Sequence, residues 1–266
     1  MSNRVWYFVS DVHLGLDYNN PRERERKFAS FLNSLPQNTE ALYLLGDIFD
    51  FWYEYKDVIP RGYTRVLGAL ASVVDRGIKV YFFNGNHDIW TYNYLEQEVG
   101  VEILKQPYVV DIATKRFCLG HGDGLGCGDL GYKFLRGCFA NRFLQVLFSS
   151  LHPRIAFSLG NSWSKKNRLE HERRADKLSS DGVDIPYRAS FKFKGADERI
   201  VKFSEQFQSE QLSKHLGKID YFIFGHLHYR INYPLKNGGE LFILGEWIHT
   251  CDYLVFDGQN LISKDF

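Results

Sequence analysis

The chain has 266 residues, of which 44% are hydrophobic and 24% are charged. This composition is that of an ordinary globular protein, and it excludes a chain that is mostly disordered, collagen-like or a long coiled coil. The formal net charge of +1 argues against a protein that binds nucleic acid over much of its surface, so we expect no nucleic-acid partner.

The first third of the chain alternates strand-like segments with helix-like ones. Residues 4–10, 41–47 and 79–88 are rich in β-branched and aromatic side chains and predict buried strands. Residues 22–35 and 62–76 carry apolar side chains at helical spacing. This alternation predicts a parallel sheet with crossover helices, in which a ligand site lies at the carboxyl ends of the strands.

The C-terminal half carries further short apolar segments with polar ends. We predict strands over residues 116–123, 219–228, 240–247 and 252–258. Residues 124–200 differ from these segments, because they are rich in serine and arginine and favour helices over strands. We therefore expect a single domain over residues 1–266 that contains a helical, basic lid insertion over residues 124–200. The sequence does not define an oligomeric state.

Polar clusters follow the apolar segments at five places. The clusters are Asp11-Val12-His13, Gly46-Asp47, Gly85-Asn86-His87-Asp88, Gly120-His121 and Gly225-His226-Leu227-His228. One such cluster alone is usually a solvated turn or a buried structural histidine. Five clusters at predicted strand ends, holding five of the nine histidines, indicate instead that these side chains share one site.

The side chains in these clusters are metal ligands by chemistry. Carboxylate, imidazole and amide oxygen together suit divalent ions such as manganese, iron or zinc. Two ions with about four ligands each, one of them a shared carboxylate, need about seven ligand residues, and the clusters supply seven. A pair of ions about 3.5–4 Å apart stabilises the attacking and leaving oxygens of a phosphoryl displacement. The sequence therefore predicts metal-assisted hydrolysis of a phosphate ester or anhydride.

Cysteine usage and hydropathy indicate where the protein works. The four cysteines are scattered and form no CxxC pair, which favours a reducing compartment. No uncharged apolar run approaches the roughly 20 residues that cross a bilayer, and the first residues do not form a signal peptide. We expect a cytoplasmic protein that at most lies on a membrane surface.

The ordered clusters between residues 11 and 228 resemble those of the calcineurin-like metallophosphoesterases. This resemblance implies an α/β fold, a four-layer α/β/β/α sandwich of two mixed sheets. It also implies which residues hold which ion. One ion would be held by Asp11, His13, Asp47 and His228, and the other by Asp47, Asn86, His121 and His226, with Asp47 bridging.

A closer resemblance is to the UDP-2,3-diacylglucosamine pyrophosphatases within that family. It rests on residues 46–52, on residues 121–123 followed by residues 129–133, and on the helical insertion. These enzymes use manganese at the inner face of the membrane and cleave UDP-2,3-diacylglucosamine to UMP and 2,3-diacylglucosamine 1-phosphate in lipid A biosynthesis. The resemblance therefore implies two Mn²⁺ ions and a lipid-nucleotide substrate. The best-known branch carries arginine at the position of His87, so a water-soluble nucleotide or phosphoester remains an alternative substrate.

The resemblance also implies roles for individual residues. Asp47, Asn86 and His87 would be catalytic, with His87 donating a proton to the leaving group or stabilising charge on phosphorus. Alternatively, His87 is a structural partner of Asp88. The implied substrate contacts are Asn86, His87, Asp129, Asn161, Ser164, Lys165, Lys166, Arg168 and His226. A non-catalytic scaffold is a further alternative, against which the intact ligand set argues.

The insertion combines positive charge with an apolar stripe. Residues 133–194 carry a net charge of +8, whereas the rest of the chain carries −7. The stripe at helical spacing comprises Phe139, Phe143, Val146, Leu147, Ser150 and Leu151. Core packing or a solvated surface would explain each feature singly, but the combination favours a lid that binds lipid at an anionic inner-membrane surface. We expect no large core around the insertion's aromatic residues Phe134, Phe139, Phe143, Phe148, Phe157 and Trp163.

Overall fold

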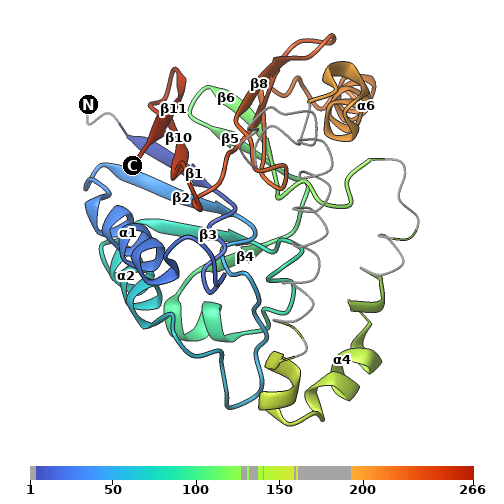
Figure 1. Cartoon of the computed structure of the whole chain (residues 1–266). Helices are drawn as coiled ribbons and strands as arrows, with labels where there is room; N and C mark the ends of the chain where they lie inside the picture. Colours follow the sequence, from blue (N-terminus) through green and yellow to red (C-terminus); the bar gives the residue numbers. More distant parts are fainter. Residues whose placement is uncertain (1–3, 127–130, 132–136, 140, 159, 161–192) are drawn as a thin grey trace, which may run out of the picture.

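Two mixed β-sheets pack against each other at the centre of the protein, with helices on their outer faces (Figure 1). The computed structural model describes residues 4–126, 131, 137–139, 141–158, 160 and 193–266. The apolar strand segments recognised in the sequence form the middle of these sheets.

The first sheet has six strands in the order β11-β10-β1-β2-β3-β4. Their bounds are β1 Val5–Val9, β2 Thr39–Leu45, β3 Lys79–Phe83, β4 Glu102–Leu104, β10 Asp252–Phe256 and β11 Leu261–Asp265. Strands β1 to β4 are parallel, whereas β10 and β11 add to the edge in antiparallel fashion. The predicted parallel sheet is thus confirmed and extended by an antiparallel edge.

The second sheet has five strands in the order β5-β6-β7-β9-β8. Their bounds are β5 Tyr108–Ile112, β6 Lys115–Leu119, β7 Tyr221–Phe224, β8 Ile231–Pro234 and β9 Glu240–Ile243. Strands β6, β7 and β9 run parallel, and the two edge strands run antiparallel to their neighbours. The carboxyl ends of β6 and β7 therefore lie at one edge, as those of β1, β2 and β3 do in the first sheet.

Three apolar clusters separate four layers. The helices α1 (Pro21–Ser34) and α2 (Thr64–Asp75) pack on the outer face of the first sheet, and α6 (Arg199–Ser213) packs on the outer face of the second. Between the sheets, the rings of Phe8 and Phe117 stack with centroids 5.8 Å apart. The four-layer α/β/β/α arrangement is confirmed. Two short helical segments, η1 (Leu95–Val99) and η3 (Gly195–Asp197), lie between the larger elements.

The predicted elements differ from the observed ones mainly at their ends and at sheet edges. The predicted strand over residues 79–88 is too long, because β3 ends at Phe83 and the side chain of Asn84 then donates to the carbonyl of Asp88. The edge strands β4, β5, β8 and β11 were not predicted from the sequence. These strands are three to five residues long and largely half-exposed, so they lack a clear apolar pattern.

The predicted insertion contains the helix α4 (Arg142–Ser149), whose N-cap Asn141 accepts hydrogen bonds from two backbone N–H groups. Aromatic side chains in and near α4 join an aromatic cluster on the core. The cluster combines Phe51, Tyr53 and Trp90 with Phe139, Phe148 and Phe157. The expectation that no core surrounds the insertion's aromatic residues is therefore wrong for those last three. Phe134 and Trp163 lie outside the described residues.

Candidate metal centre

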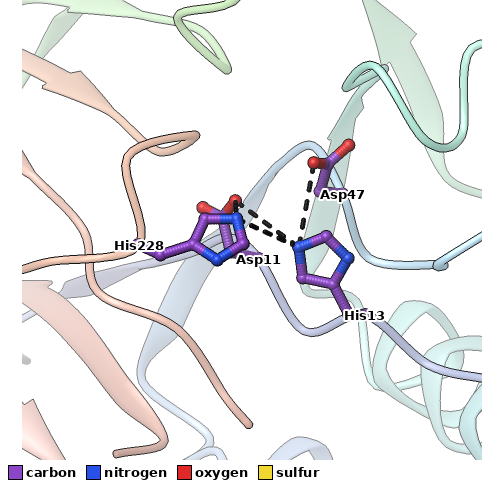
Figure 2. A group of neighbouring side chains, drawn as sticks. All are labelled: Asp11, His13, Asp47 and His228. Carbon is purple, nitrogen blue, oxygen red and sulfur yellow. Dashed lines mark hydrogen bonds and ion pairs between the residues drawn. The ribbon is translucent and has the colours of Figure 1, made fainter. Parts of the chain in front are cut away.

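The seven predicted metal ligands gather where strands of both sheets end. Four of them come two residues after a strand: Asp11 after β1, Asp47 after β2, His121 after β6 and His226 after β7. His13 and His228 follow two residues beyond Asp11 and His226, and Asn86 comes three residues after β3. Figure 2 shows Asp11, His13, Asp47 and His228 with their side chains directed toward one another.

The backbone at these positions is strained. Asp11, His13, Asp47, His226 and His228 have φ angles of 54°, 49°, 53°, 70° and 59°, in the left-handed region that side chains other than glycine rarely adopt. Each such residue costs on the order of 1–3 kcal/mol and persists only where the surrounding structure holds it. Strain shared by five of seven predicted ligands is typical of a site that directs its side chains to one point.

The first cluster of donor atoms surrounds His13. Its Nε2 lies 3.2 Å from Nε2 of His228 and 3.8 Å from Oδ2 of Asp47. Nε2 of His228 lies 3.2 Å from Oδ1 of Asp11. Imidazole nitrogens and carboxylate oxygens directed at one another in a buried site form a donor set that fits a divalent transition ion.

The second cluster surrounds His121. Its Nε2 lies 3.3 Å from Oδ2 of Asp47 and 3.2 Å from Oδ1 of Asn86. The ring of His226 lies beside it, with centroids 5.1 Å apart. Asp47 thus belongs to both clusters, which is the geometry expected of a carboxylate that two ions share.

Burial keeps two of the histidines neutral. It lowers the pKa of His13 and that of His226 to about 4 each, because a charged imidazole loses its hydration there. A neutral imidazole presents a lone pair on one ring nitrogen, which is the form that binds a metal ion.

Four other predicted ligands, two aspartates and two histidines, shift one another's pKa values toward the charged forms. Burial alone would raise the pKa of Asp47 and of Asp11, but neighbouring histidines, chiefly His121 and His228, outweigh it and the pKa of each carboxyl ends below its usual value. Conversely, burial would lower the pKa of His121 and of His228, but the two carboxylates raise it above the usual value. Buried carboxylates that require nearby positive charge suit a cation.

Asp50 contacts one of the predicted ligands. Its Oδ1 lies 3.2 Å from Nδ1 of His13, so the opposite nitrogen of that ring faces the cluster. Carboxylates of this kind fix the tautomer and the orientation of metal-binding histidines. The sequence analysis gave Asp50 no role, although a carboxylate three residues after Asp47 was a signal that could have found it.

Asp88 fixes the turns that carry Asp47 and Asn86. Its buried carboxylate accepts hydrogen bonds from the backbone N–H groups of Asp47, Ile48, Phe49 and Gly85, at 3.2, 2.8, 3.2 and 2.7 Å respectively. Burial raises the pKa of this carboxyl to about 7. Asp88 thus ties the end of β2 to the end of β3.

His87 lies beside the first cluster, with its ring centroid 4.9 Å from that of His13. Its backbone N–H donates to Oδ1 of Asp47 at 2.9 Å, and its ring Nδ1 lies 2.9 Å from the backbone carbonyl of Asp50. The carboxylate of Asp88 is bonded to backbone N–H groups, whereas the ring of His87 is bonded to Asp50.

Two glycines let ligand side chains pack closely against the backbone. A Cβ atom on Gly85 would lie 2.1 Å from Oδ1 of Asp47, and one on Gly225 would lie 2.4 Å from Oδ2 of Asp11. Neither carboxylate could keep its position beside a larger residue. This close approach explains why glycine precedes the ligand clusters at these two positions.

The remaining predicted substrate contacts have no described position. Asp129, Asn161, Ser164, Lys165, Lys166 and Arg168 lie outside the described residues. Asn86, His87 and His226, which were also predicted to contact substrate, lie in the metal centre.

The fold and the two ligand clusters define a class of protein. Residues 6–230 match the family model of the calcineurin-like phosphoesterases. The chain therefore belongs to the calcineurin-like phosphoesterase family and is a metal-dependent hydrolase.

Three named relatives are similar to this chain over 64% or more of its length. The chain is 33% identical to a UDP-2,3-diacylglucosamine hydrolase of Porphyromonas gingivalis, over 97% of this chain and 96% of that protein. It is 35% identical to the enzyme of that name from Aeromonas salmonicida over 64% of this chain and 66% of the relative. With the Haemophilus influenzae enzyme it shares 25% identity over 91% and 90% of the two chains.

Proposed function

We propose that this chain hydrolyses the diphosphate of UDP-2,3-diacylglucosamine and releases UMP and 2,3-diacylglucosamine 1-phosphate, a step of lipid A biosynthesis. The observation that carries this proposal is the 33% identity, along nearly the whole of both chains, to a relative named for that substrate. Support comes also from the two ligand clusters, whose donor types suit the hydrolysis of a phosphate anhydride.

The proposed centre holds two ions, which we assign as Mn²⁺. Asp11, His13, Asp47 and His228 would hold one, and Asp47, Asn86, His121 and His226 the other. Such ions lower the pKa of water and neutralise phosphate charge when they are bound. The protein's part is to keep these seven side chains in place, through Asp50, Asp88 and the strained backbone.

His87 is the proposed proton donor to the leaving oxygen. A carbonyl oxygen only accepts hydrogen bonds, so Nδ1 of His87 must carry a proton to bond with the carbonyl of Asp50. Nε2 is then the nitrogen left to meet a substrate oxygen. As an imidazolium, His87 would donate from Nε2 or stabilise negative charge on phosphorus, which are standard roles of a catalytic histidine.

The substrate proposal is tested by product analysis of the full chain with added Mn²⁺. We expect UDP-2,3-diacylglucosamine in mixed micelles to yield UMP and a lipid monophosphate, identified by mass spectrometry. Hydrolysis of bis-p-nitrophenyl phosphate or cyclic nucleotides without any turnover of the UDP lipid would instead assign the enzyme a water-soluble substrate. Protein that binds no transition metal and turns over none of these compounds would be a scaffold.

We also propose that α4 lies on an anionic membrane surface at the cytoplasmic face of the inner membrane. The apolar side chains of α4 are exposed, at 75% for Phe143, 64% for Val146 and 59% for Leu147. The opposite side of the segment is attached to the core, since Tyr53 donates through its hydroxyl to the carbonyl of Gln145. The helix is thereby held with an apolar face toward solvent, which is costly unless that face is covered.

The charge of the segment around α4 and the lengths of the described helices favour attachment to the membrane surface. The segment 133–194 around α4 carries a net charge of +8, which complements anionic lipid headgroups. Within the described part of the chain, no helix has the length and hydropathy needed to cross a bilayer. In Figure 1, α4 lies apart from the strands of the two sheets.

We expect the double replacement of Phe143 and Leu147 by serine to weaken membrane binding by about 10-fold or more, measured on vesicles of phosphatidylglycerol and phosphatidylethanolamine. The reason is that burying each of these apolar side chains contributes roughly 1.5–3 kcal/mol. Flotation measures this binding. Leu212→Ser on α6, where leucine is 44% exposed, is the matched control and should bind as the unaltered protein does. Unchanged flotation of the double variant would contradict the membrane proposal.

A further inference from the structure

A buried carboxylate outside the ligand set connects the chain segments that carry two ligands. Asp252, the first residue of β10, is 1% exposed. Its Oδ2 accepts hydrogen bonds from Nε of Arg230 at 3.0 Å and from the backbone N–H of Gly245 at 3.0 Å. Its backbone carbonyl accepts from Nε1 of Trp247 at 2.9 Å. Asp252 thus contacts Arg230, which precedes β8, and also Gly245 and Trp247, which follow β9.

The contacts with Arg230 and Trp247 each lead to one ligand. Arg230 comes two residues after His228, so the ion pair with Asp252 fixes the chain just beyond that ligand. Trp247, held through its indole, donates its backbone N–H to the carbonyl of Asp11 at 3.0 Å. Asp11 and His228 are themselves in contact, with Oδ1 and Nε2 3.2 Å apart.

The two ligands follow strands of different sheets, so a contact between the sheets can fix the position of one ligand relative to the other. Asp11 follows β1 of the first sheet, whereas His228 follows β7 of the second. Their relative position therefore depends on how the sheets lie against each other at this edge. Asp252 belongs to the first sheet and Arg230 immediately precedes β8 of the second, so their ion pair joins the sheets beside the ligands. Arg230 also pairs with Asp265 on β11.

We propose that Arg230 and Asp252 are positioning residues that hold Asp11 and His228 together around one metal ion. This inference rests on the ligand set assigned under the proposed function. Partners of this kind, one step removed from a metal, commonly change its affinity 10–100-fold when they are replaced. The side chain of Arg230 is 41% exposed and that of Asp252 is 1% exposed, so removing the guanidinium leaves a buried carboxylate without its cation and also costs folding stability. Selective weakening of one ion, and not a loss of stability, is therefore the result that identifies a positioning role.

The experiment is a calorimetric titration of Mn²⁺ into metal-free full-length protein. We expect Arg230→Ala to bind one ion roughly 10-fold or more weakly and the other ion with unaltered affinity. Arg230→Lys, which keeps the charge, should recover part of the loss. Asp252→Asn should show the same selective weakening, because it loses the charge that pairs with Arg230. Its amide oxygen can still accept from the N–H of Gly245, so that contact is kept. The unfolding temperature of metal-free Arg230→Ala is measured alongside, to establish that the variant is folded at the temperature of the titration.

Arg4→Ala is the matched control, since Arg4 forms a surface ion pair with Glu40 at 3.1 Å and lies at the amino end of β1, away from the ligands. This variant should bind both ions as the unaltered protein does. Equal Mn²⁺ affinities in Arg230→Ala and the unaltered protein would overturn the inference. Equal weakening of both ions would also overturn it. If the unaltered protein bound no Mn²⁺, the proposed ligand set itself would fail, and this result is distinct from the other two.

Discussion

Asp47→Ala is expected to lower turnover by at least about 10³-fold, a larger loss than the 10–100-fold typical of residues one step removed from a metal. The carboxylate of Asp47 belongs to both ligand clusters, with Oδ2 3.3 Å from Nε2 of His121 and 3.8 Å from Nε2 of His13. Its removal takes one ligand from each proposed ion at once. Steady-state kinetics and metal analysis of the purified variant measure the two effects together.

Two further variants make the Asp47 result interpretable. Asp47→Asn keeps the shape and an oxygen that can accept the N–H of His87, so it separates loss of charge from loss of local structure. It should lose metal and activity while remaining folded. Asp75→Ala, at an exposed position ending α2, controls for the removal of a carboxylate and should behave as the unaltered protein. An Asp47→Ala protein with unaltered turnover would contradict the bridging role.

His87→Ala is expected to reduce turnover about 10²–10⁴-fold, the range of general acid–base catalysis, and to leave two ions bound. The contact of His87 with Asp47 runs through its backbone N–H, so alanine at this position preserves it. Only the imidazole beside His13 is lost. Turnover of the UDP lipid and the Mn²⁺ content of the same preparation are the two measurements.

An exposed histidine provides the control for this second experiment. His152→Ala lies in the insertion and should change neither turnover nor metal content. Loss of one ion in His87→Ala, with activity recovered by excess Mn²⁺, would mean that His87 serves the metal centre and not the leaving group. Full activity in His87→Ala would remove it from the mechanism.

The sequence predicted the turns that bring the predicted ligand side chains to the strand ends, because the signals of such turns are local. An apolar strand followed after two residues by an aspartate or a histidine recurs at Asp11, Asp47, His121 and His226. Strand periodicity and residue type suffice to recognise that pattern, and the alternation with helices implies that the strand ends share an edge. Edge strands such as β8 and β11 were missed because half-exposed segments carry little periodic signal.

In the predicted insertion, the local sequence pattern did not predict which aromatic side chains are buried. No large core was expected around its aromatic residues, but Phe139, Phe148 and Phe157 pack against Phe51, Tyr53 and Trp90, whereas Phe143 is exposed. Helical spacing defines a face of α4 without saying what that face meets. Only the contact with the aromatic surface of the core separates the side that is buried from the side that is free to meet lipid.

The sequence by itself indicated the family and predicted seven ligand residues at strand ends, because these features depend on neighbours close in the chain. The tertiary structure decided which ligands meet. Asp11 and His228 come from different sheets, and the roles of Asp50, Asp88 and Asp252 appear only where distant segments pack together. Side-chain pairing across two sheets depends on their packing at the shared edge, and no periodicity within one segment encodes that packing.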